Sequence, residues 1–302
     1  MKRLFFIMIL VVLLLSAAVP AMADNPGTGN SNFAVQNISA DAASVTVEYY
    51  DQSGVQDVTG GTPFTLNGHG SRVFESSTLP VGDGWIGSVV ILADKQVAAM
   101  TELTWQSTIG SLNDQITGAA YSGTYNPGVN LYLPYATVKP PQNIPTKKRR
   151  FSIVTIQNAG SANTNITMYY YNQIGGSLTA TVTDTIPAYR SKSYNLSTPG
   201  GKVPDLNGGD WQGSIFVQSD SQPIAGVVTT HWAAISWQQW AEAYEGVSAG
   251  STTLYAPSVV RVNRTSDPTV GTWVRHSQFS VQNVGKRRRK ASFVRLPNHL
   301  RK

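Results

Sequence analysis

The sequence contains no cysteine. Disulfide bonds, thiolate metal sites and a catalytic cysteine are therefore excluded, and packing alone must stabilise the fold. Histidine is also scarce, and no spacing among the four residues would place two imidazoles on one face of an element. The four are His69, His231, His276 and His299. We therefore expect neither a metal site nor a bound cofactor.

Acidic residues are sparse as well, and no pair has the arrangement expected of a glycosidase. One segment, Gly246-Val247-Ser248-Ala249-Gly250, matches the G-x-S-x-G pattern of hydrolase nucleophile elbows. That elbow requires a helix after the serine, whereas a strand is expected over 252–259. The corresponding place in the first half of the chain, 123–128, has no serine at the nucleophile position. We predict a loop here, and a protein that is not an enzyme.

Only one long apolar run is present, from Leu4 to Val19. Lys2 and Arg3 precede it and Ala21-Met22-Ala23 follows, which together form the three parts of a secretory signal peptide, 1–23. The run falls short of the roughly 20 residues of a membrane-spanning helix. We expect a secreted protein, extracellular or at the cell surface, with no membrane span after signal removal.

Positive charge is concentrated at the C-terminus, where 286–302 holds eight Lys or Arg and no acid. The remainder of the mature chain is mildly acidic, which argues against nucleic acid as a partner. Three interpretations of the end of the chain stay open. The residues after about 285 follow from a frameshift or gene fragment, the basic run binds anionic polymer or lipid, or strand 278–284 completes a neighbouring sheet edge.

Internal similarity is the strongest feature of the sequence. Phe33-Ala34-Val35-Gln36-Asn37 recurs as Val154-Thr155-Ile156-Gln157-Asn158 and as Phe279-Ser280-Val281-Gln282-Asn283. Trp85-Ile86-Gly87-Ser88 matches Trp211-Gln212-Gly213-Ser214, and Leu131-Tyr132-Leu133-Pro134 matches Leu254-Tyr255-Ala256-Pro257. These spacings indicate a unit of about 120 to 125 residues.

Alternating apolar residues predict seven strands in the second unit, separated by Gly- and Asn-rich turns. Their ranges are 151–158, 164–171, 177–184, 188–195, 212–218, 223–231 and 252–259. The fold class is therefore all-β, with two tandem immunoglobulin- or fibronectin-like antiparallel β-sandwiches plus a truncated third repeat. A closed barrel is the main rival.

We place the first sandwich at 24–136, a proline-rich and basic linker at 137–150, the second sandwich at 151–260, and the truncated third repeat with its basic tail at 261–302. Lys139-Pro140-Pro141 and Pro145 favour a stiff linker. We expect each Leu-Tyr-x-Pro segment to close the sandwich that precedes it, the alternative being a strand shared between neighbours.

The order Leu-Tyr-x-Pro, Val-Gln-Asn, Tyr-Tyr, Gly-Ser resembles tandem β-sandwich repeats of large secreted proteins from Chloroflexota-like bacteria. The resemblance covers most of 33–284. It implies a surface repeat module of unassigned activity, and it supplies no functional residue.

One aromatic segment stands out as a candidate binding patch, formed by Trp232, Trp237, Trp240 and Tyr244. The residues around Trp237 and Trp240 favour helix, so a short amphipathic turn would place both indoles on one face. Such a face could bind a partner or stack on sugar rings, and the alternative is a lid packed over the sandwich. Trp85 and Trp211 are expected in the core.

Three functions follow from these observations. The first is a non-catalytic structural or adhesive repeat protein of a cell surface or extracellular matrix. The second is a carbohydrate-binding protein that uses the tryptophan-rich loop, and the third is a strand-donating filament subunit. The expected partners are a surface polysaccharide or neighbouring copies of the chain.

Overall fold

The computed structural model describes residues 28–54, 57–106, 116–139, 148–234, 240–256, 261–264, 273–276 and 279–284. In this part of the chain the protein is all-β, and every strand pairing is antiparallel. No sheet closes on itself among these residues, so the predicted all-β sandwich class is confirmed. The described helices are short 3-10 turns, none of the length and apolar character that crossing a bilayer requires.

The first unit is a sandwich of two sheets. One sheet contains, in spatial order, β4 (Ser71–Phe74), β1 (Thr28–Asn37), β6 (Val97–Gln106) and β7 (Ile116–Ser122). The other contains β3 (Phe64–Leu66), β2 (Ala43–Asp51) and β5 (Gly87–Ala93). Alternate residues of β2, including Val45 and Tyr49, pack against Phe33 and Val35 of β1 to form the core between the sheets.

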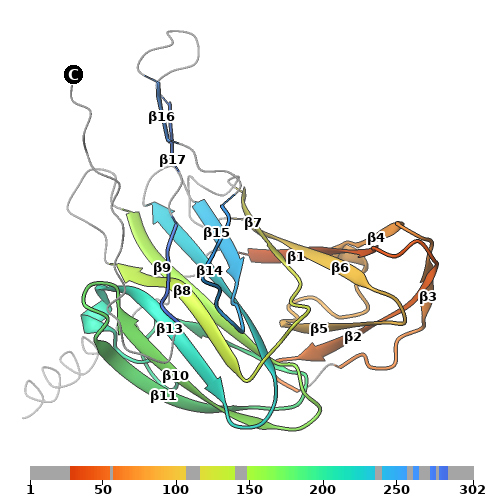
Figure 1. Cartoon of the computed structure of the whole chain (residues 1–302), viewed down its shortest axis with the longest axis horizontal. Helices are drawn as coiled ribbons and strands as arrows, with labels where there is room; N and C mark the ends of the chain where they lie inside the picture. The colour runs from red at the N-terminus through yellow and green to blue at the C-terminus, as the bar shows by residue number, and fades with distance from the viewer. Residues whose placement is uncertain are drawn as a thin grey trace, which may run out of the picture.

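The second unit repeats this order with one additional strand (Figure 1). One layer contains β12 (Ser191–Asn195), β9 (Lys148–Asn158), β14 (Ile224–Ala234) and β15 (Trp240–Glu245). The other contains β11 (Leu178–Ile186), β10 (Thr164–Asn172), β13 (Trp211–Ser219) and β8 (Asn130–Lys139). Its core is more completely buried than that of the first unit.

Strand β8 corrects the expected domain boundary. It contains the first Leu-Tyr-x-Pro segment, yet it pairs with β13 along most of its length and with β9 at Val138 and Lys139. The segment therefore completes the sandwich that follows it in the chain. Of the expected linker 137–150, residues 137–139 belong to β8 and 148–150 to β9, and 140–147 lie outside the described residues. Residues 123–129 connect the two sandwiches instead.

Pro134 is accommodated in β8 by a β-bulge. Leu133 pairs with Ile215 and Ala136 with Gly213, so that Pro134 and Tyr135 together face the single residue Ser214. Proline has no N–H to donate, and a bulge is one of the few places where a strand tolerates it. The bulge also changes which alternate residues of β8 face the core. Odd-numbered residues, Leu131 and Leu133, are buried before it, and even-numbered ones, Ala136 and Val138, after it.

The last strand predicted in the second unit, 252–259, is wrong for the residues that the structure describes, 252–256. Residues 252–256 form no strand, and the seventh strand is β15, within the segment expected to be helical. Helix propensity is a weak preference that tertiary pairing commonly overrides. Here β15 pairs with the edge of β14 from Val227–Glu245 to Trp232–Trp240.

A two-stranded sheet follows the second sandwich, formed by β16 (Arg261–Arg264) and β17 (Trp273–His276). Its pairing of Arg261 with His276 corresponds to that of Val138 with Phe151 at the corner between β8 and β9. The offsets, 123 and 125 residues, equal those of the repeated motifs. The basic tail after 284 lies outside the described residues.

The repeated Gln-Asn pair has the same structural role in both units. Asn37 and Asn158 are each fully buried at the end of the first strand. The amide nitrogen of Asn37 donates to the carbonyl oxygens of Asp41, Leu66 and Asn67, and that of Asn158 to those of Ala162, Ile186 and Pro187. Each side-chain oxygen accepts a backbone N–H two residues later. The asparagine of each pair thus joins two loops of one sandwich and reaches no solvent.

The two sandwiches contact each other through a buried aromatic cluster. His231 on the outer face of β14 lies edge-on to Trp105 of β6, with ring centroids 4.6 Å apart. Phe151 stacks on the other side of the imidazole at 5.3 Å. Burial lowers the pKa of His231 to about 4, because the charged imidazolium would lose its hydration.

A second contact joins the loop before β12 to the first unit. Arg190 forms an ion pair with Asp57 and donates to the carbonyl oxygen of Asp51. Beside it the rings of Tyr50 and Tyr189 lie 5.1 Å apart. Two separate patches therefore fix the orientation of one sandwich relative to the other.

Candidate functional site at the end of the second sandwich

The predicted aromatic patch lies at the hairpin between β14 and β15. Trp232 is half-buried near the end of β14, and its backbone pairs with that of Trp240 at the start of β15. Trp237 lies outside the described residues. The expected helical turn is wrong for 240–245, since these residues are a strand, and the structure gives no common helical face for the two indoles.

Tyr244, the fourth residue of the predicted patch, is partly buried against the second core and contributes to the fold. Its hydroxyl donates to the carbonyl oxygen of Tyr135 and accepts the N–H of the same residue at 3.1 Å. Tyr135 is the bulged residue of β8, so the hydroxyl satisfies the two backbone groups that the bulge releases from the ladder. Burial raises the pKa of Tyr244, which keeps this hydroxyl protonated.

Two described side chains at this end of the sandwich carry opposite charges. Glu242 of β15 and Arg150 of β9 lie close enough for their charges to interact. Burial raises the pKa of the Glu242 carboxyl, and the Arg150 guanidinium partly offsets that rise. Arg150 also donates to the side-chain oxygen of Gln212 at 2.8 Å, and Gln212 in turn lines a surface cavity.

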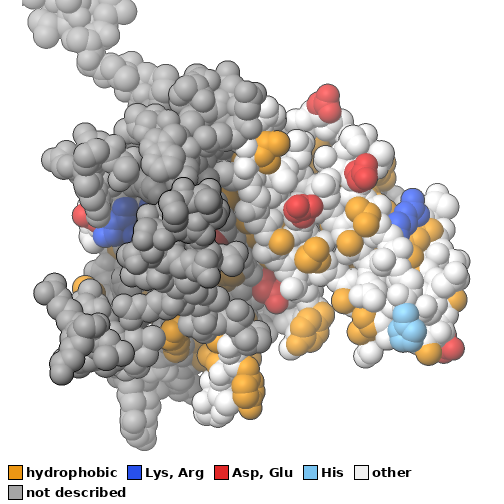
Figure 2. All heavy atoms as spheres, turned by 90° about the horizontal axis from the view of Figure 1, so that it is seen from above, with side chains coloured by type: hydrophobic (Ala, Val, Ile, Leu, Met, Phe, Trp, Pro, Cys, Tyr) orange, Lys and Arg blue, Asp and Glu red, His pale blue; other side chains and the backbone are white. Residues whose placement is uncertain are grey.

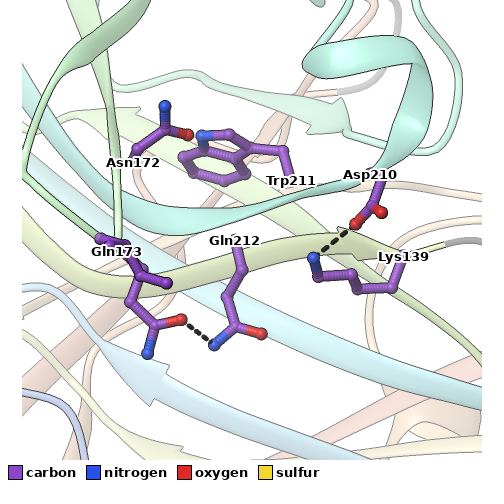
Figure 3. A pocket seen from close by; sticks show the side chains of 7 residues that line it. Lys139, Asn172, Gln173, Asp210, Trp211 and Gln212 are labelled. Carbon is purple, nitrogen blue, oxygen red and sulfur yellow. Dashed lines mark hydrogen bonds and ion pairs between the residues drawn. The ribbon is translucent and has the colours of Figure 1, made fainter.

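That cavity has a volume of about 240 Å³ and lies where β8, β10 and β13 end. Its lining residues are Lys139, Asn172, Gln173, Ile174, Asp210, Trp211 and Gln212 (Figure 3). Gln212 donates to the side-chain oxygen of Gln173 at 2.5 Å, and Lys139 forms an ion pair with Asp210. Ile174 stands beside these polar groups with 89% of its surface exposed.

Trp211 forms the floor of the cavity and belongs to the core, as predicted. It is 1% exposed and lies edge-on to Tyr170, with ring centroids 5.9 Å apart. Its indole Nε1 is buried without a hydrogen-bond partner. The corresponding Trp85 packs against the first core but is only partly buried.

The G-x-S-x-G segment is a connection rather than an elbow. Ser248 donates from its hydroxyl to the carbonyl oxygen of Asn126 at 3.0 Å, and 251–256 contain no helix. A Cβ on Gly246 would lie 2.6 Å from the side chains of Leu131 and Leu133. The glycine is therefore required by the close approach of β8. Within the described ranges, no three acidic or histidine side chains gather where they could hold a metal ion.

Composition alone does not reveal the amide-lined cavity, but one difference between the units points to it. The repeated Trp-x-Gly-Ser motif has Ile86 in the first unit and Gln212 in the second. Ile86 is 65% exposed, whereas Gln212 is bonded to both Gln173 and Arg150. The face of the first unit seen in Figure 2 carries scattered apolar side chains among several acidic and few basic ones.

Neither a protein-family model nor a curated protein sequence matches this chain.

Proposed function

We propose that the chain is an exported, non-catalytic structural protein of a cell surface or extracellular matrix, in which two sandwiches act as a spacer of fixed shape. The observation that carries this proposal is the double contact between the units. His231 is enclosed by Trp105 and Phe151, and Arg190 pairs with Asp57 at a separate place.

Fixed orientation is what distinguishes a spacer from domains joined by a free linker. Contacts between domains of one chain are commonly small and polar, and relative motion is then expected. Here one of the two contacts is aromatic and buried, and Trp105 is 9% exposed. Two contacts at different places oppose rotation about either one.

The use of the repeated residues supports the same proposal. Asn37 and Asn158 bond loops within the sandwiches, and Tyr244 bonds the bulge of β8. These residues stabilise the fold and are unavailable to a substrate. The predicted signal peptide and the resemblance to secreted repeat modules support export.

Two measurements test the proposal. In cells that encode the chain, protease added outside should digest it before lysis, and digestion only after lysis would contradict export. Small-angle scattering of the purified chain should fit one rigid arrangement, and Arg190→Glu should increase the radius of gyration. Lys95→Glu, in the exposed turn before β6, is the matched control that should leave the radius unchanged.

A second candidate function is polysaccharide contact at the cavity of Figure 3. The observation that favours it is the pair of amides, Gln173 and Gln212, beside exposed Ile174, since amides offer both donors and acceptors to hydroxyl groups. Glycan-array binding that is lost in Gln173→Ala would support this function. Retention of binding in that variant would exclude the cavity.

A further inference from the structure

The two sandwiches differ at one edge. In the second unit β8 pairs with the outer edge of β13. In the first unit β5 occupies the place of β13, and among the described residues its outer edge pairs with no strand. No Leu-Tyr-x-Pro segment precedes β1 in the sequence. In the part of the chain that the structure describes, the first sandwich has seven strands where the second has eight.

The core of the first unit is open beside this edge. Val89 and Ile91 of β5 take the same positions opposite β2 that Ile215 and Val217 take opposite β10. Ile215 and Val217 are 0% exposed, whereas Val89 and Ile91 are only partly buried. Beneath β8, Leu131 would lie 2.7 Å from a Cβ on Gly226 and 2.6 Å from one on Gly246.

The first unit has a similar but narrower gap. Ala99 and Gly123 take the positions of Gly226 and Gly246, and the three atoms nearest to a Cβ on Gly123 all belong to Ala99. The Cβ of Ala99 takes the place where a Cβ on Gly226 would lie 2.7 Å from Leu131, so a leucine added to this edge would have to lie farther from β6 than Leu131 lies from β14. In the first unit the described residues place no such side chain there.

The chain contains a second segment that matches part of β8 but belongs to no described sheet. Leu254-Tyr255-Ala256 reproduces Leu131-Tyr132-Leu133 at an offset of 123 and is likewise followed by proline. Leu254 is 72% and Tyr255 90% exposed, and neither is in a strand. Shortly after this segment, β16 and β17 repeat the corner pairing of β8 and β9.

We propose that the outer edge of β5 binds the Leu254-Tyr255-Ala256 segment of a second copy of this chain as an added strand. Main-chain hydrogen bonds would supply affinity, and Leu254 would cover the partly buried side chains of Val89 and Ile91. The added segment is expected to pair with β5 in the register in which β8 pairs with β13. Leu254 lies opposite Ile91, and Tyr255 lies opposite Val90.

The donor is a second copy because of where the segment lies. The corresponding edge in the second unit of the same chain is already occupied by β8. In Figure 1, β16 and β17 stand beyond the second sandwich, well away from β5 of the first. A C-terminal segment that completes the first sandwich of the next copy is a head-to-tail contact, which forms an open filament unless it closes into a ring.

Cross-linking with introduced cysteines tests this register, since the chain has none of its own. The N–H and carbonyl of Tyr132 bond to Val247, so Tyr132 and Phe216 are a non-hydrogen-bonded pair. The Cα atoms of such a pair lie about 4.5 Å apart, which suits a disulfide. Two populations, V90C and Y255C, should therefore form a covalent dimer when mixed under oxidation.

The matched control is a mixture of V73C and Y255C, because Val73 is exposed on β4, the edge strand of the opposite sheet. Equal dimer yields in the two mixtures would overturn the proposal. So would a monomeric intramolecular disulfide in the double variant V90C/Y255C, which would make the chain its own donor.

A charge on the donor provides a second test. Leu254 is exposed in the single chain, so Leu254→Asp should fold normally while placing a carboxylate over the apolar side chains of Val89 and Ile91. Light scattering should show masses above the monomer that grow with concentration in the parent chain and are lost in Leu254→Asp. Leu178→Asp, an exposed leucine on the edge strand β11, should retain them.

A strictly monomeric parent chain at high concentration would contradict the inference. The inference goes beyond the proposed function and does not depend on it, because both tests use purified protein. A negative result for strand addition would not contradict export or the spacer role. An intracellular location would not contradict strand addition.

Discussion

At the residue scale, the buried asparagines show how one side chain can hold a sandwich corner. The amide of Asn158 donates to three carbonyl oxygens at 2.7, 3.0 and 3.2 Å, and its oxygen accepts the N–H of Gly160 at 2.9 Å. All of these groups are at the junction of two loops. Removal of the amide would leave several backbone groups without a partner.

We therefore expect Asn158→Ala to lower the free energy of unfolding by about 2 to 4 kcal/mol, since each stranded buried group costs about 1 to 3 kcal/mol and partial relaxation limits the sum. Urea denaturation followed by circular dichroism measures the change. Gln218→Ala, at an exposed position of β13, is the control and should change stability little. A similar small loss in both variants would contradict the role assigned to Asn158.

His231 makes stability depend on pH. Its pKa is about 4 in the folded chain, against about 6.5 for an unperturbed histidine, so the unfolded chain binds the additional proton between these values. Stability should be full above pH 6.5 and fall by about 3 kcal/mol as pH drops toward 4.

The midpoint of unfolding, measured across this pH range, should depend less on pH in His231→Leu than in the parent chain. His69→Asn is the control and should keep the parent pH dependence, because His69 is exposed, with φ of 59°. An unchanged pH profile in His231→Leu would assign the acid sensitivity to other groups.

At the element scale, the strands could be predicted from the alternation of apolar residues, and the pairing of edges could not. Six of the seven strands expected in the second unit are present near their predicted ranges. Strand β15 was missed because Gln238, Ala241, Glu242 and Ala243 favour helix in isolation. Its strand form depends on the edge of β14, which is a tertiary property.

The role of Leu-Tyr-x-Pro was also not predictable from spacing, because a strand between two units can complete either one. The bulge at Pro134 and its bond to Tyr244 assign β8 to the second unit. The candidate site was predicted only in part for the same reason. Trp232 and Tyr244 lie at the expected end of the sandwich, but the amides of the cavity come from strands and turns distant in sequence.

Loss of the Tyr244 hydroxyl tests the bond to the bulge. Tyr244→Phe should reduce the free energy of unfolding by about 1 to 3 kcal/mol, because the N–H and carbonyl of Tyr135 would be left buried without this partner. Hydrogen exchange should show faster opening of β8 in the variant. Loss of glycan binding at unchanged stability in Tyr244→Phe would instead support the role of Tyr244 in a binding patch.

At the scale of the whole molecule, the position of β8 decides which fragments fold. A fragment of residues 124–250 contains all eight strands of the second sandwich, whereas 151–260 lacks β8 and retains the segment that resembles it. We expect the first fragment to unfold cooperatively and the second to aggregate or remain unfolded, since it exposes the edge of β13 and the core beside it. Size-exclusion chromatography and thermal denaturation distinguish the two. Equal stability of both fragments would contradict the assignment of β8.

The repeated sequence unit and the folded sandwich begin and end at different residues, and this difference has a consequence for gene duplication. If a gene segment that starts at the Gln-Asn strand and ends after Leu-Tyr-x-Pro is duplicated, every internal copy receives its eighth strand from the copy before it. The first copy in such a series is left with a vacant groove and the last with a spare strand. If the proposed strand addition occurs, the two ends of the series are complementary at any number of copies, and a longer gene would still encode a chain that can join to the next molecule.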